Sequence, residues 1–120
     1  MSTTAAILGL ETHQLTDWEK DFFSEVQPWG YILFARNVDT PEQILALTDS
    51  LRELSGRENV PILIDQEGGR VQRLRPPHWY EYPTARSLGD LANHDPSKAA
   101  RAVWLMSRLH AFDLKAIGIN

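Results

Sequence analysis

Short apolar runs followed by polar residues recur three times along the chain. Residues 5–10, 30–34 and 61–64 are continuous apolar stretches, and polar residues follow each of them at once. Such runs are typical of β-strands, and the 61–64 run has the composition of a strand buried on both faces. The pattern therefore predicts three strands, each with polar groups at its carboxyl end.

Two amphipathic helices are predicted between these strands. The first begins after Thr16, which has the spacing of a capping box with Glu19, and it ends near residue 28. The second begins with Thr40 as its N-cap and ends at Gly56. Apolar residues at helical spacing are expected on their buried sides: Trp18, Phe22, Phe23 and Val26 in the first helix, and Ile44, Leu45, Leu47, Leu51 and Leu54 in the second.

The rest of the chain predicts one long helix and the start of a fourth strand. Asp95 and Pro96 begin a helix that runs to about Ala116, Gly118 ends it, and residues 117–120 have the composition of a strand. Strands and helices that alternate with short connections predict an α/β fold with a parallel sheet covered by helices. The expected buried side of the long helix comprises Ala99, Ala102, Val103, Met106, Leu109 and Leu114.

Composition narrows the classes of function. The chain has 120 residues, 42% of them apolar, which suits one globular domain with a modest core. Its net charge is −4 and its basic residues are scattered except around residues 70–75, so nucleic-acid binding is not expected. The absence of cysteine excludes disulfides and thiolate metal sites and fits the cytosol. The N-terminal residues lack a basic region and have only a short apolar run, so neither a signal peptide nor a membrane span is expected there.

The strand at 61–64 leads into the richest candidate chemistry. Asp65 closes this apolar strand, and because burying a lone carboxylate is costly, it must lie where water or a ligand can reach it. Gln66 and Glu67 follow, and then Gly68 and Gly69, which allow positive φ and close approach of the backbone to a ligand. Arginines follow at positions 70, 73 and 75.

Two interpretations of this stretch stay open from the residues alone. Carboxylate acceptors and forked guanidinium donors on a glycine turn suit the hydroxyl groups of a polar small molecule. Alternatively, the acids and arginines of a loop pair with one another. Phosphate binding by Arg70, Arg73 and Arg75 is disfavoured because no glycine-rich turn opens directly into a helix N-terminus. His13 is interpreted as a loop residue and His110 as structural, since no second histidine has metal-ligand spacing to His13.

The nine residues 65–73, DQEGGRVQR, resemble family 3 glycoside hydrolases, and specifically the bacterial β-N-acetylhexosaminidases of cell-wall recycling. Residues 32–37 and 114–120 resemble the second strand and the third-helix exit of the same family. The resemblance covers essentially the whole chain. It implies that residues 1–120 form the N-terminal third of a single catalytic domain with a (β/α)₈ TIM-barrel fold, with about three βα units and the start of a fourth strand. Such barrels carry their sites at the carboxyl ends of the strands.

By this resemblance, Asp65 would accept hydrogen bonds from the ring hydroxyls of the sugar at the non-reducing end, and Arg73 would donate to them. In the family the nucleophile is an aspartate and the acid/base is a histidine on a mobile loop. Both lie beyond the position of Asn120, so no catalytic residue is expected in this chain and the 120 residues alone are expected to be inactive. Glu67 is interpreted as a structural partner of the arginines.

The resemblance implies a cytoplasmic enzyme that removes terminal β-linked N-acetylglucosamine from peptidoglycan fragments, the glucosaminyl-anhydromuramyl peptides, by a retaining mechanism. It implies a carbohydrate substrate, no metal or organic cofactor, and no nucleic-acid or membrane partner. The alternative is a non-catalytic carbohydrate- or partner-binding fragment that keeps Asp65 and Arg73. Trp79, Tyr80 and Tyr82 could stack on sugar rings or cover the barrel end, and cover is the interpretation adopted because aromatic burial is the commoner use.

Overall fold

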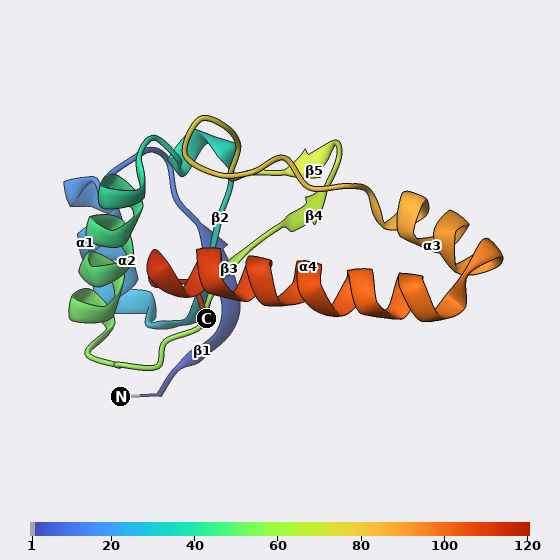
Figure 1. Cartoon of the computed structure of the whole chain (residues 1–120). Helices are drawn as coiled ribbons and strands as arrows, with labels where there is room; N and C mark the ends of the chain where they lie inside the picture. Colours follow the sequence, from blue (N-terminus) through green and yellow to red (C-terminus); the bar gives the residue numbers. More distant parts are fainter. Residues whose placement is uncertain (1) are drawn as a thin grey trace.

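A computed structural model describes residues 2–120 and shows a three-stranded parallel sheet (Figure 1). Its strands lie in the order β1-β2-β3, with neighbouring strands parallel. The bounds are β1 Thr4–Gly9, β2 Pro28–Leu33 and β3 Ile62–Ile64. Because the carboxyl ends of parallel strands meet at one edge of a sheet, the three polar segments predicted from the sequence come together there. The predicted α/β fold with a parallel sheet is confirmed.

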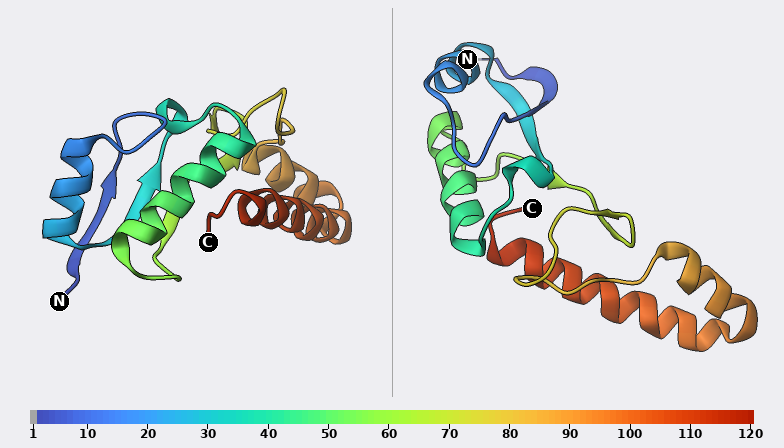
Figure 2. Two further views of the ribbon diagram at one scale, coloured as in Figure 1. Left: turned by 90° about the vertical axis from the view of Figure 1, so that its left-hand side faces the viewer. Right: turned by 90° about the horizontal axis from the view of Figure 1, so that it is seen from above.

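Helices α1 (Asp17–Val26) and α2 (Pro41–Ser55) lie side by side and cover one face of the sheet (Figure 2). The capping box at the start of α1 is present, because Thr16 accepts from the Glu19 N–H at 3.1 Å and Glu19 accepts from the Thr16 N–H at 2.8 Å. Gly56 ends α2 in the left-handed conformation with φ 64°. Both helices therefore begin and end where local sequence signals place them.

The core lies between the sheet and these helices. Its fully buried side chains include Leu10, Tyr31, Leu33, Ile44, Leu51, Val60, Ile62 and Leu74. The predicted burial of two residues is wrong. Trp18 is 68% exposed and stacks on Phe22, and Leu45 is 41% exposed. The expectation of burial on both faces of β3 is also wrong beyond Ile62, since Leu63 and Ile64 are only half-buried where helices cover one face of the sheet.

A short antiparallel hairpin follows β3, and the sequence did not predict it. It consists of β4 (Gln66–Gly68) and β5 (Val71–Gln72). Gly68 and Gly69 form its turn with φ of 93° and 62°, which confirms the expected positive φ. The backbone of Pro83 lies where a side chain on Gly68 would stand, so glycine is required by close approach as well as by φ.

Two helices follow the hairpin and form an antiparallel pair that projects away from the sheet (Figures 1 and 2). The sequence did not predict α3 (Ala85–His94), whereas α4 (Pro96–Ala116) has its expected bounds. The expected buried side of α4 is partly wrong, because Val103 is 44% and Leu109 is 50% exposed. The first half of α4 packs against α3 alone, so much of its surface is uncovered.

The chain returns to the sheet after α4. Gly118 has φ 80°, and the following residues run beside β3, where the Asn120 N–H donates to the Ile62 carbonyl at 3.3 Å and the Ile62 N–H donates to Asn120 Oδ1 at 2.9 Å. Residues 117–120 thus occupy the place of a fourth strand without forming a regular ladder. None of the described helices is long and apolar enough to cross a membrane.

Candidate functional site

The candidate site lies at the carboxyl end of β3, where Asp65 and Arg73 form an ion pair. Arg73 Nη2 lies 3.2 Å from Asp65 Oδ2. The side chain of Asp65 is 43% exposed and that of Arg73 is 27% exposed, so the pair is open to solvent and to a ligand. The guanidinium also lies over the ring of Phe34, 5.7 Å from its centroid. The structure therefore brings together the two residues singled out in the sequence as substrate-binding candidates.

The hairpin places Arg73 opposite Asp65 through a half-buried glutamine, Gln66, whose role sequence reasoning missed. Gln66 Oε1 accepts from the Arg73 N–H at 3.1 Å and from the Leu74 N–H at 3.0 Å, and Gln66 Nε2 donates to the Leu74 carbonyl at 3.0 Å. These bonds fix the backbone that carries Arg73. The guanidinium Nε is buried and has no hydrogen-bond acceptor among residues 2–120. The accessible part of the guanidinium is therefore at its Nη atoms, one of which is bonded to Asp65.

The polar residues after β2 support this site. The 3₁₀ turn η1 (Ala35–Asn37) places Asn37 in the core, where its Nδ2 donates to the carbonyls of Leu10 and Thr12 at 3.2 and 2.8 Å. Its Oδ1 accepts from the Phe34 N–H at 2.9 Å. Asn37 therefore joins the ends of β1 and β2 and holds in place the ring on which Arg73 lies.

The arginine pairing expected of Glu67 is wrong. Glu67 is exposed on β4 and takes part in no ion pair among the residues that the structure describes. A strand directs successive side chains to opposite faces, and Glu67 is thereby turned away from its neighbours in sequence. Arg75 instead lies 3.5 Å from Glu81. The pairing interpretation is met by the Asp65–Arg73 salt bridge, and because this pair is accessible the binding of a small molecule stays a prediction.

A hollow of about 280 Å³ adjoins Arg73. Arg73, Arg75, Asp39, His78 and Trp79 are among its lining residues. Trp79 and Tyr82 are 8% and 6% exposed, which confirms that they serve as cover, whereas Tyr80 is 76% exposed and covers nothing. The hollow extends the polar surface around the ion pair.

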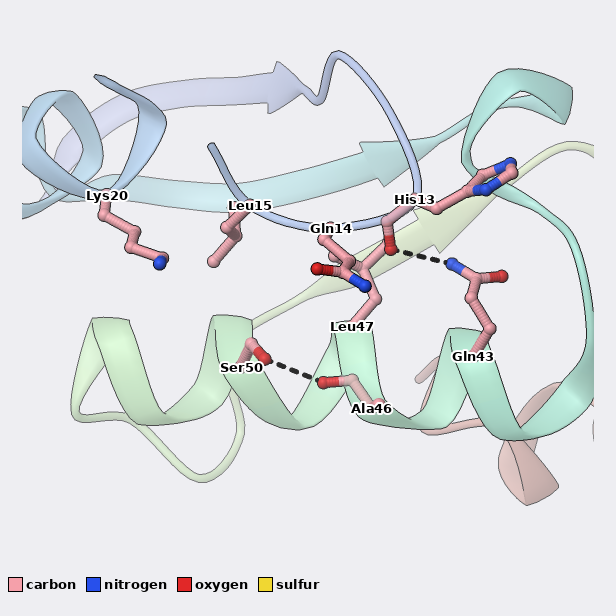
Figure 3. Close-up of a pocket in the computed structure, with 8 residues that line it drawn as sticks. All are labelled: His13, Gln14, Leu15, Lys20, Gln43, Ala46, Leu47 and Ser50. Carbon is pink, nitrogen blue, oxygen red and sulfur yellow. Dashed lines mark hydrogen bonds between the residues drawn. The ribbon is translucent and has the colours of Figure 1, made fainter. Parts of the chain in front are cut away.

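A second hollow of similar volume lies between α1 and α2 and is shown in Figure 3. His13 lies at its rim in the loop after β1, exposed as expected of a loop residue, and its backbone carbonyl accepts from Gln43 Nε2 at 2.9 Å. Lys20 and Ser50 line the same hollow. No group of three or more histidine and acidic side chains that could hold a metal is present within residues 2–120.

Tyr82, which is buried, and His110, which is half-buried, form an aromatic pair beside the hairpin. The Tyr82 hydroxyl donates to Asp113 Oδ2 at 2.6 Å, and its ring meets the His110 ring edge-on with centroids 4.1 Å apart. Burial, together with the hydrogen bond to Asp113, raises the pKa of Tyr82 above its usual value. Burial lowers the pKa of His110, against an opposite effect of the Asp113 charge. His110 thus packs against Tyr82, in keeping with the structural role predicted for it, and no local pattern in the sequence indicates this contact.

Known proteins similar to this chain are β-hexosaminidases. The β-hexosaminidase of Alkalilimnicola ehrlichii is 37% identical over 114 residues, which are 95% of this chain and 32% of that protein. The β-hexosaminidase of Methylococcus capsulatus is 38% identical over 103 residues, 85% of this chain and 29% of that protein. The chain therefore spans about a third of the length of these curated relatives. No model of a protein family matches the chain.

Solved structures agree with these relatives. NagZ from Neisseria gonorrhoeae, in complex with a zinc ion, superposes with a TM-score of 0.89 at 32% identity over 98% of this chain and 35% of that one. A glycoside hydrolase family 3 β-N-acetylglucosaminidase from Paenibacillus superposes with a TM-score of 0.80 at 29% identity over 95% of this chain and 21% of that one. Over nearly its whole length, the chain is thus a homologue of the N-terminal third of the β-hexosaminidases, with the fold of the corresponding part of NagZ.

Proposed function

We propose that this chain is the sugar-binding part of a β-N-acetylhexosaminidase of glycoside hydrolase family 3, with the fold of the first third of a (β/α)₈ barrel. Its relatives carry the name β-hexosaminidase, and one NagZ structure similar to it is a complex with N-trifluoroacetyl-D-glucosamine. The proposed substrate is a terminal non-reducing β-linked N-acetylglucosamine of a peptidoglycan fragment. Cytoplasmic location and a retaining mechanism belong to the same proposal and rest on the family resemblance.

The accessible Asp65–Arg73 pair at the carboxyl end of β3 is the observation that carries this proposal. A carboxylate that accepts one bond from an arginine keeps further lone pairs for sugar hydroxyl groups. The guanidinium, whose side chain is 27% exposed, keeps further N–H groups beyond its bond to Asp65. Adjacent hydroxyls of a sugar ring present both a donor and an acceptor to such a pair, and so match it chemically.

In this proposal the two residues position the sugar and take no part in bond breaking. Retaining hydrolysis needs a nucleophile on one face of the sugar and a proton donor for the leaving oxygen. Asp65 is engaged by Arg73 at 3.2 Å, so it is suited to hold hydroxyls and not to attack a carbon atom. The nucleophile and the acid/base would come from the part of a β-hexosaminidase to which these 120 residues do not correspond.

Hydrolysis by the protein expressed from its complete gene tests the proposal. We expect turnover of an aryl β-N-acetylglucosaminide and at least about hundredfold slower turnover of the aryl β-glucoside, because groups left unpaired by the missing acetamide are costly. Proton NMR of the first released sugar should show the β-anomer if the configuration is retained. Binding of N-acetylglucosamine without turnover would instead indicate a non-catalytic carbohydrate-binding protein, and neither binding nor turnover would refute both.

A further inference from the structure

Tyr82 is bonded at once to helix α4 and to the hairpin that carries Arg73. Its hydroxyl donates to Asp113 Oδ2 on α4 at 2.6 Å, and its side chain is almost fully buried. Its backbone N–H donates to Gln72 Oε1 at 3.1 Å, and its carbonyl accepts from the Gly69 N–H at 3.0 Å. Gln72 is the last residue of β5 and immediately precedes Arg73.

Within the hairpin, the bonds of Gln66 hold the Arg73 backbone, but the two strands have few bonds with each other. Strands β4 and β5 are paired only at Gln66↔Gln72 and Gly68↔Val71, with an irregularity between them. A two-stranded hairpin of this size is at best marginally stable in water. Its position must therefore be fixed by contacts with the rest of the chain, and α4 is the nearest regular element bonded to it through Tyr82.

The Tyr82–Asp113 bond has the properties of a strong anchor. It joins a hydroxyl to a carboxylate in a partly buried place, and such charge-assisted bonds are shorter and about twice as strong as neutral ones. The T-shaped contact with His110, on the same helix as Asp113, fixes the ring as well. The side chain of Gln72, which is buried and belongs to the hairpin, accepts from the Tyr82 N–H and also donates to the carbonyls of Leu74 and Tyr80, each at 2.7 Å. These bonds hold the hairpin against the segment that contains Tyr82.

We propose that Tyr82 and Asp113 are positioning residues that hold Arg73 in register with Asp65. The consequence for sugar binding rests on the proposed function, whereas the effect on Arg73 itself does not. Neither residue touches the ion pair, so both act through Gln72 and the hairpin backbone. A loss of the hydroxyl should leave the sheet intact and allow Arg73 to move relative to Asp65.

Tyr82→Phe tests this in the protein expressed from its complete gene, with Tyr80→Phe as the matched control. Both variants remove one hydroxyl, but Tyr80 is exposed and its hydroxyl forms no hydrogen bond within residues 2–120. Without sugar, we expect Tyr82→Phe to speed hydrogen exchange at the Gly69 amide at least about tenfold and to shift the Arg73 Nε–Hε NMR signal. Tyr80→Phe should change neither. Asp113→Asn, which keeps an acceptor but removes the charge, should act in the same direction with a smaller effect.

A double-mutant cycle separates positioning from general stability. N-acetylglucosamine affinity should fall about fivefold in Tyr82→Phe, and Tyr82→Phe combined with Arg73→Lys should bind no more weakly than Arg73→Lys alone. Additive losses would overturn the proposal, because they would mean that Tyr82 acts independently of Arg73. An unshifted Arg73 signal in Tyr82→Phe would also overturn it. If the wild-type protein binds no sugar, the proposed function fails, and the Arg73 signal alone still decides whether Tyr82 positions this residue.

Discussion

Asn37→Ala tests whether the carboxyl ends of β1 and β2 are joined as the structure shows. The side chain is fully buried and makes three hydrogen bonds, with the Phe34 N–H and with the carbonyls of Leu10 and Thr12. Alanine leaves the Phe34 N–H and the Thr12 carbonyl without these partners, whereas the Leu10 carbonyl keeps a bond from Arg36 Nε at 2.7 Å. Because both groups are only partly buried, each lost partner should cost in the lower half of the usual range of roughly 1–3 kcal/mol, about 1–2 kcal/mol, so we expect a loss of about 2–4 kcal/mol.

Urea unfolding of the protein expressed from its complete gene measures this loss. With a slope of about 2 kcal/mol per molar urea, the midpoint should fall by about 1–2 M with no change in slope. Asn93→Ala is the matched control, because Asn93 is exposed on α3 and its side chain makes no hydrogen bond in the described part of the chain. A midpoint for Asn37→Ala within 0.2 M, roughly the scatter of such measurements, of the control would refute the reasoning.

Three further predictions concern the hairpin, the buried histidine and the isolated chain. Gly68→Ala should lower the free energy of unfolding, measured in urea, by more than about 2 kcal/mol, because Gly68 has φ 93° and the Pro83 backbone lies where the Cβ would stand. Gly89→Ala in α3 is the control: its Cβ would meet nothing, so the free energy of unfolding should stay the same or rise by about 0.5–1 kcal/mol. Burial lowers the pKa of His110, so its neutral form is favoured on folding. The stability that this contributes should be full above pH 6.5, its usual pKa, and should fall as the pH decreases below it, with a smaller fall in His110→Gln. Residues 1–120 alone should bind a hydrophobic dye and self-associate in sedimentation, because apolar side chains such as Phe112 are exposed. They should hydrolyse no aryl β-N-acetylglucosaminide, because no catalytic residue is expected among them. A monomer with a sharp cooperative unfolding transition would contradict the first expectation, and turnover would contradict the second.

Elements with local signals could be predicted from the sequence. The capping box at Thr16, the N-cap at Thr40 and the left-handed glycine at residue 56 each fix a helix end through contacts within a few residues. The apolar runs of β1 to β3 likewise specify strands, and their alternation with helices specifies the parallel sheet. The contacts that fix these features lie within a few residues of one another, so the local sequence is enough to predict them.

Features that depend on distant contacts were missed. Helix α3 is an exception, since it was missed although Thr84 caps it and its sequence is amphipathic; it is short, has no buried residue and packs chiefly on α4. The β4–β5 hairpin has a charged and glycine-rich sequence and depends on Gln66, which binds the Arg73 backbone, and on Gln72, which binds the Tyr82 backbone outside the hairpin. At the site, Asp65 could be placed because it ends a buried strand, whereas the link from Tyr82 to Asp113 spans 31 residues and leaves no periodic signal.

The steady-state rate of Asp65→Ala and Arg73→Lys on an aryl β-N-acetylglucosaminide tests the central claim most directly. Each change leaves sugar hydroxyls and the remaining partner without bonds, and Arg73→Lys replaces a fork with a point donor. At about 1–3 kcal/mol for each unpaired group, kcat/KM should fall about 10- to 1000-fold in the protein expressed from its complete gene. Glu67→Gln, which changes an exposed neighbour outside the ion pair, should leave kcat/KM unchanged. Near-normal kcat/KM for Asp65→Ala or Arg73→Lys would contradict the assignment of the sugar site to this pair.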